Sequence, residues 1–140
     1  MAVTITPYNQ TKKKLINSEY DLTNLKVMLR SSTTFTATDT VVSDLDGTEV
    51  SGNGWTAGGE AIANAAVTIV DTDDAQLDGD DVRVTATGGN IGPSDGYVII
   101  DDTDVDPELV AFIDPDGAKE AGNGTEFQVN WDVNGIIRLT

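Results

Sequence analysis

Short apolar runs, separated by turns rich in Gly and Asp, recur along this chain of 140 residues. Turn signals come roughly every 8 to 14 residues, which is the spacing found in antiparallel β-sandwiches and barrels. The expected strands are 25–29, 66–70, 75–77, 82–87, 97–100, 109–113, 127–131 and 136–139. Because no helical pattern separates these runs, a parallel α/β sheet is not expected. The predicted fold class is all-β: an antiparallel, jelly-roll-like β-sandwich with a short N-terminal helix, forming a single domain over residues 1–140.

The alternation of side chains assigns faces to the expected strands. In LKVML, Leu25, Val27 and Leu29 share one face, while Lys26 and Met28 lie on the other. The runs at 97–100 and 109–113 are fully apolar, as central strands would be.

The segments between the strands carry their own signals. A helix is expected at 8–17, which Pro7 can open, and a helical turn within 39–46. Residues 31–40 read as a loop or a weak strand, 71–75 as a turn, and 88–96 as a loop. Asn134-Gly135 marks a tight turn that would join the last two strands as a hairpin.

The charge of the chain is strongly negative. Asp and Glu total 24 against eight Lys and Arg, so the net charge is −16. A polyanion repels nucleic acid and anionic membranes, so neither is an expected partner. In molar salt the Debye length falls to about 3 Å, which screens the self-repulsion of such a surface. A halophilic setting is therefore predicted, the alternative being an acidic soluble protein of an ordinary cell.

The basic residues gather near the N-terminus. Residues 1–30 hold five bases and two acids, whereas residues 31–140 hold three bases and 22 acids. The five bases are Lys12, Lys13, Lys14, Lys26 and Arg30. Two interpretations stay open: a mildly basic end that faces an acidic neighbour, or the solvent side of a short helix.

The chain contains neither Cys nor His. Disulfides, thiolate catalysis and the usual Ser-His and Cys-His dyads are therefore excluded. Paired carboxylates could in principle hydrolyse glycosides, but close pairs arise by chance among 24 acids, and a small sandwich offers little depth for a cleft. We expect no enzyme, no cofactor, and no catalytic, cofactor-binding or metal-ligating residue.

Three acidic clusters raise the question of calcium binding: 71–81, 101–108 and 114–116. Asp102, Asp104 and Asp106 alternate as in an EF-hand loop. Pro107, however, occupies the place of the required Gly, and the final ligand position is not Glu. The favoured interpretation is that Asp fills turns by accepting hydrogen bonds from nearby backbone amides, and a structural cation is the alternative.

A Gly-rich segment, EVSGNGWTAGGEAI, spans residues 49–62. It lacks the Lys-Ser/Thr of a phosphate-binding loop, and its glycines are expected to allow positive φ in a tight connection beside Trp55. No apolar stretch approaches the roughly 18 residues of a membrane span, and the opening residues do not have the charge order of a signal peptide.

Several segments resemble a family of small virion structural proteins of tailed bacterial and archaeal viruses. They are Tyr8-Asn9, KLIN at 14–17, Asp21-Leu22, LKVML at 25–29, EVSGNGWTAGGEAI at 49–62, DGDDV at 78–82, YVIIDDTD at 97–104, ELVAFID at 108–114 and FQVNWDVNGIIRL at 127–139. The Gly-rich core is the most specific of these segments. The family has no catalytic signature, so the resemblance implies a structural part of a particle.

The resemblance implies a location in the virion. The expected function is a capsid decoration, cement or surface-projection (turret) subunit that stabilises the head of a tailed virus. The alternative is a tail or tail-fibre component that contacts the host surface. A free calcium-dependent adhesin or carbohydrate-binding module is a third possibility. The expected partners are the major capsid protein or other virion structural proteins and further copies of the chain, with no nucleic acid and no membrane.

Overall fold

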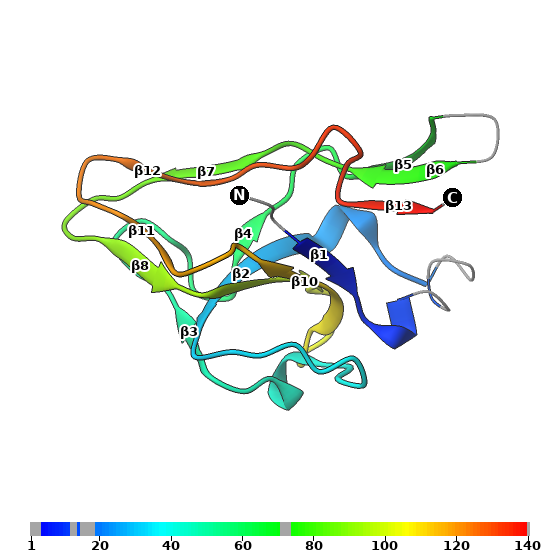
Figure 1. Cartoon of the computed structure of the whole chain (residues 1–140), viewed down its shortest axis with the longest axis horizontal. Helices are drawn as coiled ribbons and strands as arrows, with labels where there is room; N and C mark the ends of the chain where they lie inside the picture. The colour runs from blue at the N-terminus through cyan, green and yellow to red at the C-terminus, as the bar shows by residue number, and fades with distance from the viewer. Residues whose placement is uncertain (1–3, 12–13, 15–18, 71–73, 140) are drawn as a thin grey trace.

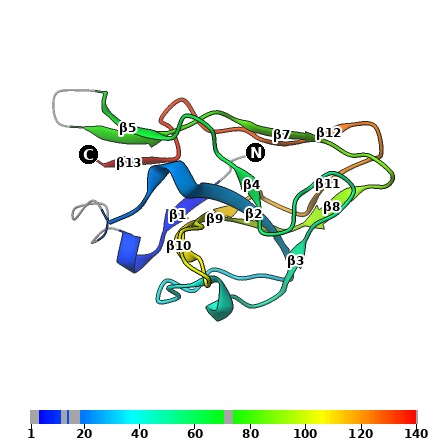
Figure 2. The same ribbon diagram turned by 180° about the vertical axis from the view of Figure 1, so that it is seen from behind.

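The computed structural model describes residues 4–11, 14, 19–70 and 74–139. Antiparallel strands form two layers, as Figures 1 and 2 show from opposite sides. One layer is a sheet of order β1-β10-β9-β2-β3, in which β4 also pairs with β2. The other layer holds β5, β6 and β13 at one end and β7 and β12 at the other, and β8 and β11 form a ribbon beside them. The predicted all-β antiparallel sandwich is confirmed.

The strand bounds follow the expected runs closely in the second half of the chain. The sheet of the first layer contains β1 (Thr4–Pro7), β2 (Leu25–Ser31), β3 (Thr48–Val50), β4 (Glu60–Ala61), β9 (Gly96–Asp101) and β10 (Glu108–Asp114). The remaining strands are β5 (Ala66–Ile69), β6 (Ala75–Asp78), β7 (Val82–Thr85), β8 (Ile91–Ser94), β11 (Lys119–Ala121), β12 (Glu126–Val129) and β13 (Ile137–Leu139).

Much of the sandwich is one long antiparallel hairpin that bends over itself. Residues 75–101 pair in order with residues 108–139: β9 with β10, β8 with β11, β7 with β12, and β6 with β13. The closed end of the hairpin lies in the first layer and its open end lies in the second. This bend gives the fold its jelly-roll-like character.

Two hydrophobic clusters explain why the central strands are continuously apolar. Leu25, Val27 and Leu29 enter the larger cluster, which fills the space between the layers. Met28 and Val98 enter a second cluster on the opposite face of the same sheet. The predicted alternation in β2 is thus confirmed, and the central sheet is buried on both faces.

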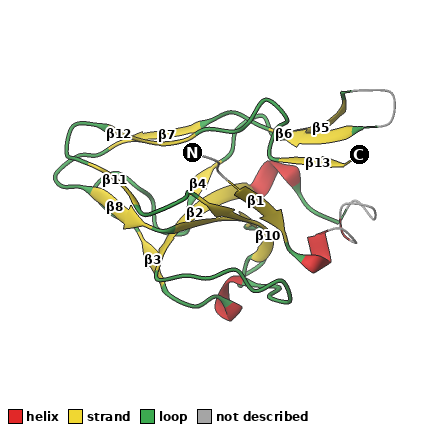
Figure 3. Cartoon of the chain, viewed as in Figure 1, coloured by secondary structure: helices red, strands yellow, loops and turns green. Residues whose placement is uncertain are grey.

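Among the described residues, helical structure is limited to short pieces, drawn red in Figure 3. Residues 9–11 and 14 are helical, and the rest of the predicted helix 8–17 lies outside the described residues. The 3₁₀ turns are η1 (Leu22–Asn24) and η2 (Val42–Asp44), the latter within the helical turn expected at 39–46. No helix in the described part of the chain is long and apolar enough to cross a membrane.

The prediction that the last two strands form a hairpin with each other is wrong. The turn at Asn134-Gly135 exists, since the N–H of Gly135 donates to the carbonyl oxygen of Asp132 at 2.8 Å. After it, the N–H of Ile136 donates to the carbonyl oxygen of Leu77 at 2.8 Å, so the chain continues along β6. β12 and β13 are therefore successive pieces of one side of the long hairpin, and the turn is a local kink between them.

The prediction that 88–96 is a loop is also wrong. Ile91–Ser94 forms β8, which pairs with β11 with a shift in register. Gly and Pro are tolerated there because the ladder is irregular. A Cβ on Gly92 would lie 2.7 Å from the carbonyl oxygen of Lys119, so the absence of a side chain lets the two chains approach.

Candidate functional site

In the acidic cluster at 101–108, carboxylates accept hydrogen bonds from backbone N–H groups of the same chain. Asp101 accepts from the N–H of Asp21 at 2.8 Å and from the N–H of Thr103 at 3.2 Å. Asp106 accepts from the N–H of Ser43 at 3.1 Å. These carboxylates join turns and loops, as the favoured interpretation predicted. Among the described residues, no group of three or more acids is arranged to hold a metal ion.

The other two acidic clusters follow the same pattern. Asp81 accepts from the N–H of Trp131 at 2.9 Å, and Asp114 accepts from the N–H of Asp116 at the same distance. Asp74 pairs with Arg138 at 2.6 Å. Residues 71–73 lie outside the described part of the chain.

Three of the N-terminal bases are engaged inside the molecule. Lys14 pairs with Glu108, and Nζ of Lys26 lies 2.5 Å from Oδ2 of Asp102. Arg30 is buried, and its Nη2 donates to the main-chain carbonyl oxygens of residues 46 and 47 at 2.9 and 3.2 Å. Lys12 and Lys13 lie outside the described residues. The described bases of this segment therefore serve the fold.

The glycines of the Gly-rich segment adopt positive φ beside Trp55, as expected, and the segment also contributes to the core. Trp55 is 2% exposed and packs edge-on against Phe127, with ring centroids 5.4 Å apart. Gly54 has φ +107°, and a Cβ there would lie 2.8 Å from the carbonyl oxygen of Thr85. The segment thus needs glycine to pass close to β7 while it delivers the indole ring to the interior.

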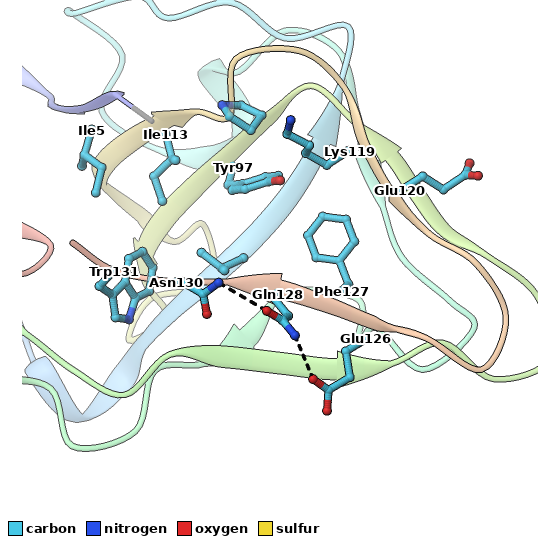
Figure 4. Close-up of a pocket in the computed structure, with 12 residues that line it drawn as sticks. Ile5, Tyr97, Ile113, Lys119, Glu120, Glu126, Phe127, Gln128, Asn130 and Trp131 are labelled. Atoms are coloured by element: carbon cyan, nitrogen blue, oxygen red, sulfur yellow. Dashed lines mark hydrogen bonds between the residues drawn. The ribbon is translucent and has the colours of Figure 1, made fainter. Parts of the chain in front are cut away.

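A pocket of about 250 Å³ opens on one side of the sandwich, between the edge strands β1 and β12 (Figure 4). Its lining residues are Ile5, Tyr97, Ile113, Pro115, Lys119, Glu120, Glu126, Phe127, Gln128, Val129, Asn130 and Trp131. The sequence predicts little depth for a cleft in a sandwich of this size and does not predict this pocket. The lining residues come from five strands of both layers, so no local sequence motif indicates the pocket.

Tyr97, a buried residue, places its hydroxyl at the floor of the pocket. Tyr97 is 4% exposed, and its ring packs edge-on against Phe127 with centroids 5.7 Å apart. Desolvation raises the pKa of the Tyr97 phenol above its usual value, so it stays protonated and can donate. Within the described residues this hydroxyl has no hydrogen-bond partner and Lys119 has no ion-pair partner. Both side chains lie on the same side of the pocket in Figure 4.

The walls of the pocket are held by the surrounding structure. Nε1 of Trp131 donates to the carbonyl oxygen of Asp80 at 2.8 Å, which fixes the indole. Along β12, Nε2 of Gln128 donates to Glu126 at 3.0 Å (dashed in Figure 4). The site is therefore largely preformed.

Beside the pocket, β12 offers a free strand edge. Of the strands that the structure describes, it pairs with β7 alone. Next to this pairing, the N–H of Ala86 donates to the carbonyl oxygen of Thr125 at 2.8 Å. The Ala86–Thr125 pair is therefore a hydrogen-bonded pair of the β7–β12 ladder. Hydrogen-bonded and non-hydrogen-bonded pairs alternate along an antiparallel ladder, and the Arg83–Gln128 pair lies three positions further along, so it is a non-hydrogen-bonded pair. The main-chain N–H and C=O of Gln128 therefore point away from β7, toward the open side.

Together these groups suit binding of an extended peptide. The apolar floor can take a side chain, and the Tyr97 hydroxyl and the Lys119 ammonium can meet polar or acidic groups. The edge of β12 can pair with a main chain. Strand addition with a side-chain pocket is a recurring mode of peptide recognition.

A second open surface lies on the sheet of β5, β6 and β13. Val67, Ile69 and Leu139 are 51%, 82% and 44% exposed. In the register of this sheet they share a face with Leu77 and Ile137, which belong to the buried core. The ribbon of this sheet extends past the strands that lie below it in Figure 1. The exposed fractions show that its outer apolar row is uncovered. The sequence predicts strand 66–70 but gives no sign of which face is left open.

Comparison of the chain with protein-family models, with curated proteins and with solved structures found no match.

Proposed function

We propose that this chain is a non-enzymatic structural subunit of a tailed-virus particle, acting as a capsid decoration, cement or surface-projection protein of the head. The resemblance to virion structural proteins supports this assignment, and its most specific segment serves the core through Trp55. The excess of acidic residues supports a setting of high salt.

The observation that carries the proposal is the pocket beside the free edge of β12. An extended segment of the major capsid protein, or of another virion protein, would pair with the main chain of Gln128. It would place an apolar side chain over Ile113 and Phe127. An acidic group on the same segment would meet Lys119, one of three bases after residue 30.

Stabilisation of the shell would follow from mass action. A subunit that binds only the assembled shell stabilises it by RT ln(1 + [L]/Kd), which is about 2.7 kcal/mol at 100 times Kd. A modest contact repeated at every equivalent site of a shell therefore stabilises the whole particle without any chemical step.

The location is tested by mass-spectrometric stoichiometry of purified virions. A decoration protein should be present at roughly hundreds of copies and a tail or fibre component at roughly a few to tens, because the shell repeats its sites far more often. Absence of the chain from purified particles would overturn the assignment.

The docking site is tested by binding of purified chain to particles stripped of it. Lys119→Gln and Tyr97→Phe should weaken binding tenfold or more while the free chain keeps its melting temperature, since neither group has a partner in the described structure. The matched control is Lys26→Gln, which changes the net charge equally but at the Asp102 ion pair. Equal binding by all three variants would place the contact elsewhere.

A further inference from the structure

The edge strand β5 is short, but it lacks the Pro, charged side chain or bulge that often prevents strands from pairing between molecules. Its residues Ala66–Ile69 are all exposed and, among the described strands, are paired only with β6. The register with β6 is regular, without a bulge. The strand contains no Pro and no charged residue, although Pro, Lys and bulges are the common protections of an edge.

The absence of charged side chains along β5, which ends before Asp71, allows a second copy of this chain to approach there. The chain carries a net charge of −16, so two copies repel over most of their surface. Residues 61–70, however, contain no charged side chain. The ion pair of Asp74 with Arg138 lies nearby, and Arg138 alternates along β13 with the apolar-face residues Ile137 and Leu139. This segment is therefore a place where like-charged copies can come into contact.

The main chain of β5 is oriented for such a contact. The N–H of Val70 donates to the carbonyl oxygen of Asp74 at 3.1 Å. Because hydrogen-bonded and non-hydrogen-bonded pairs alternate along an antiparallel ladder, Thr68 and Gln76, two positions away, also form a hydrogen-bonded pair. The N–H and C=O groups of Val67 and Ile69 then point to the open edge. Both side chains also lie on the exposed apolar face.

We propose that two copies of the chain pair through β5, antiparallel and related by a two-fold axis at Thr68. Val67 of each copy lies opposite Ile69 of the other, and each of these residues donates and accepts one main-chain hydrogen bond across the axis. The two apolar faces become one continuous surface, with Val67 and Ile69 in contact across the junction. The symmetry is closed, so pairing ends at the dimer.

This inference rests on the proposed function, since a shell holds neighbouring subunits at high local concentration. The paired segment is short, so the free dimer is weak and its population rises with protein concentration. Its population also rises with salt, because screening reduces the repulsion between the two anionic copies.

Sedimentation equilibrium of the intact chain tests the pairing, at increasing protein concentration in molar salt. The weight-average mass should rise from 14.8 kDa toward that of a dimer. Ile69→Lys, at a side chain 82% exposed, should hold the mass at the monomer value. Val105→Lys and Val133→Lys place the same charge at equally exposed valines elsewhere and should associate like the parent chain.

A second variant tests the main-chain contact. Ile69→Pro removes an N–H that faces the open edge and leaves the ladder to β6 in place, so it should also remain monomeric. A parent chain that stays monomeric at every concentration, or an Ile69→Lys variant that associates like the parent, would overturn the pairing. Detection of the chain in virions is a separate measurement, so failure of the dimer and failure of the virion assignment can be told apart.

Discussion

A Cβ atom on Gly59 would lie 2.7 Å from the carbonyl oxygen of Val27. Gly59 also has φ +99°, and it directly precedes β4, which pairs with β2. The neighbouring Gly58 has a similar φ of +88° but no atom within 4 Å of its would-be Cβ. Both glycines therefore adopt a left-handed backbone conformation, but only at Gly59 would a side chain also collide with a neighbouring strand.

We expect Gly58→Ala to lower the free energy of unfolding by about 1–2 kcal/mol, the cost of a left-handed residue with a side chain. Gly59→Ala should cost clearly more, because the backbone of β2 must also move. Urea denaturation of both variants measures the difference. Equal losses would mean that the approach to Val27 is not a constraint.

Much of the fold is predictable because it depends on local alternation. The strand at 25–29 and the fully apolar runs at 97–100 and 109–113 appear in the structure as β2, β9 and β10, with the expected faces buried. Burial on both faces leaves a direct mark on the sequence, since each position must then be apolar.

The pairing of strands and the open surfaces depend on contacts between distant residues. Asn134-Gly135 makes a local turn, but the strand that follows it pairs with β6, beginning with the hydrogen bond from the N–H of Ile136 to the carbonyl oxygen of Leu77. Gly92-Pro93 has the composition of a loop, but it lies in β8 because this strand pairs with β11 through an irregular register. The pocket around Tyr97 combines residues from both layers, so it becomes visible only in three dimensions.

Two tyrosine hydroxyls differ in their partners, which makes them a matched pair for mutation. The Tyr20 hydroxyl donates to the carbonyl oxygen of Leu109 at 2.9 Å. The Tyr8 hydroxyl is buried and has no partner among the described residues. Tyr20→Phe should lower the free energy of unfolding by about 1 kcal/mol, whereas Tyr8→Phe should leave it unchanged or raise it. Thermal denaturation compares them, and an equal loss in both would contradict the assigned bonding.

The tyrosines also predict the behaviour of the protein in alkali. Burial raises the pKa of Tyr8 and Tyr97, and raises the pKa of Tyr20 to about 12. These are all three tyrosines of the chain. Because each folded pKa lies above the unfolded value near 10, their contribution to stability is complete below about pH 10 and is lost as the pH rises further.

Ultraviolet absorbance of phenolate against pH measures this directly. The native protein should show little phenolate at about pH 10, where the chain unfolded in guanidinium is half titrated. Phenolate should then appear together with the loss of tertiary structure. Titration of one tyrosine near pH 10 in the folded state, about the pKa of an exposed phenol, would be inconsistent with its burial.

The net charge predicts a strong dependence of stability on salt. With 24 acids and eight bases, self-repulsion opposes the compact state at low ionic strength. The melting temperature should therefore rise steeply as NaCl is increased toward molar concentration, and the chain should lose structure on dialysis into dilute buffer. A melting temperature that is independent of salt would argue against a halophilic setting. Addition of a chelator in molar salt should leave it unchanged, whereas a calcium-dependent adhesin would lose stability.

Two carboxylates of the loop before β3 should respond to pH with opposite signs. The N–H and hydroxyl of Thr34 donate to Asp46 at 2.9 and 2.7 Å, and these bonds lower the pKa of Asp46. Partial desolvation, together with the charges of Asp44 and Asp46, raises the pKa of Asp39. The charged form of Asp46 therefore stabilises the fold, whereas the charged form of Asp39 opposes it.

At pH 7 we expect Asp46→Asn to lower the melting temperature and Asp39→Asn to raise it. The contribution of Asp46 is present above the unfolded pKa of about 3.9 and is lost as the pH falls through its lower folded value. The penalty at Asp39 disappears as the pH falls through its raised folded value, so both variants should converge on the parent chain in acid. Thermal denaturation at a series of pH values, at constant ionic strength, follows both differences. A shift of the same sign at pH 7 would show that net charge, rather than the hydrogen bonds of Thr34, dominates this loop.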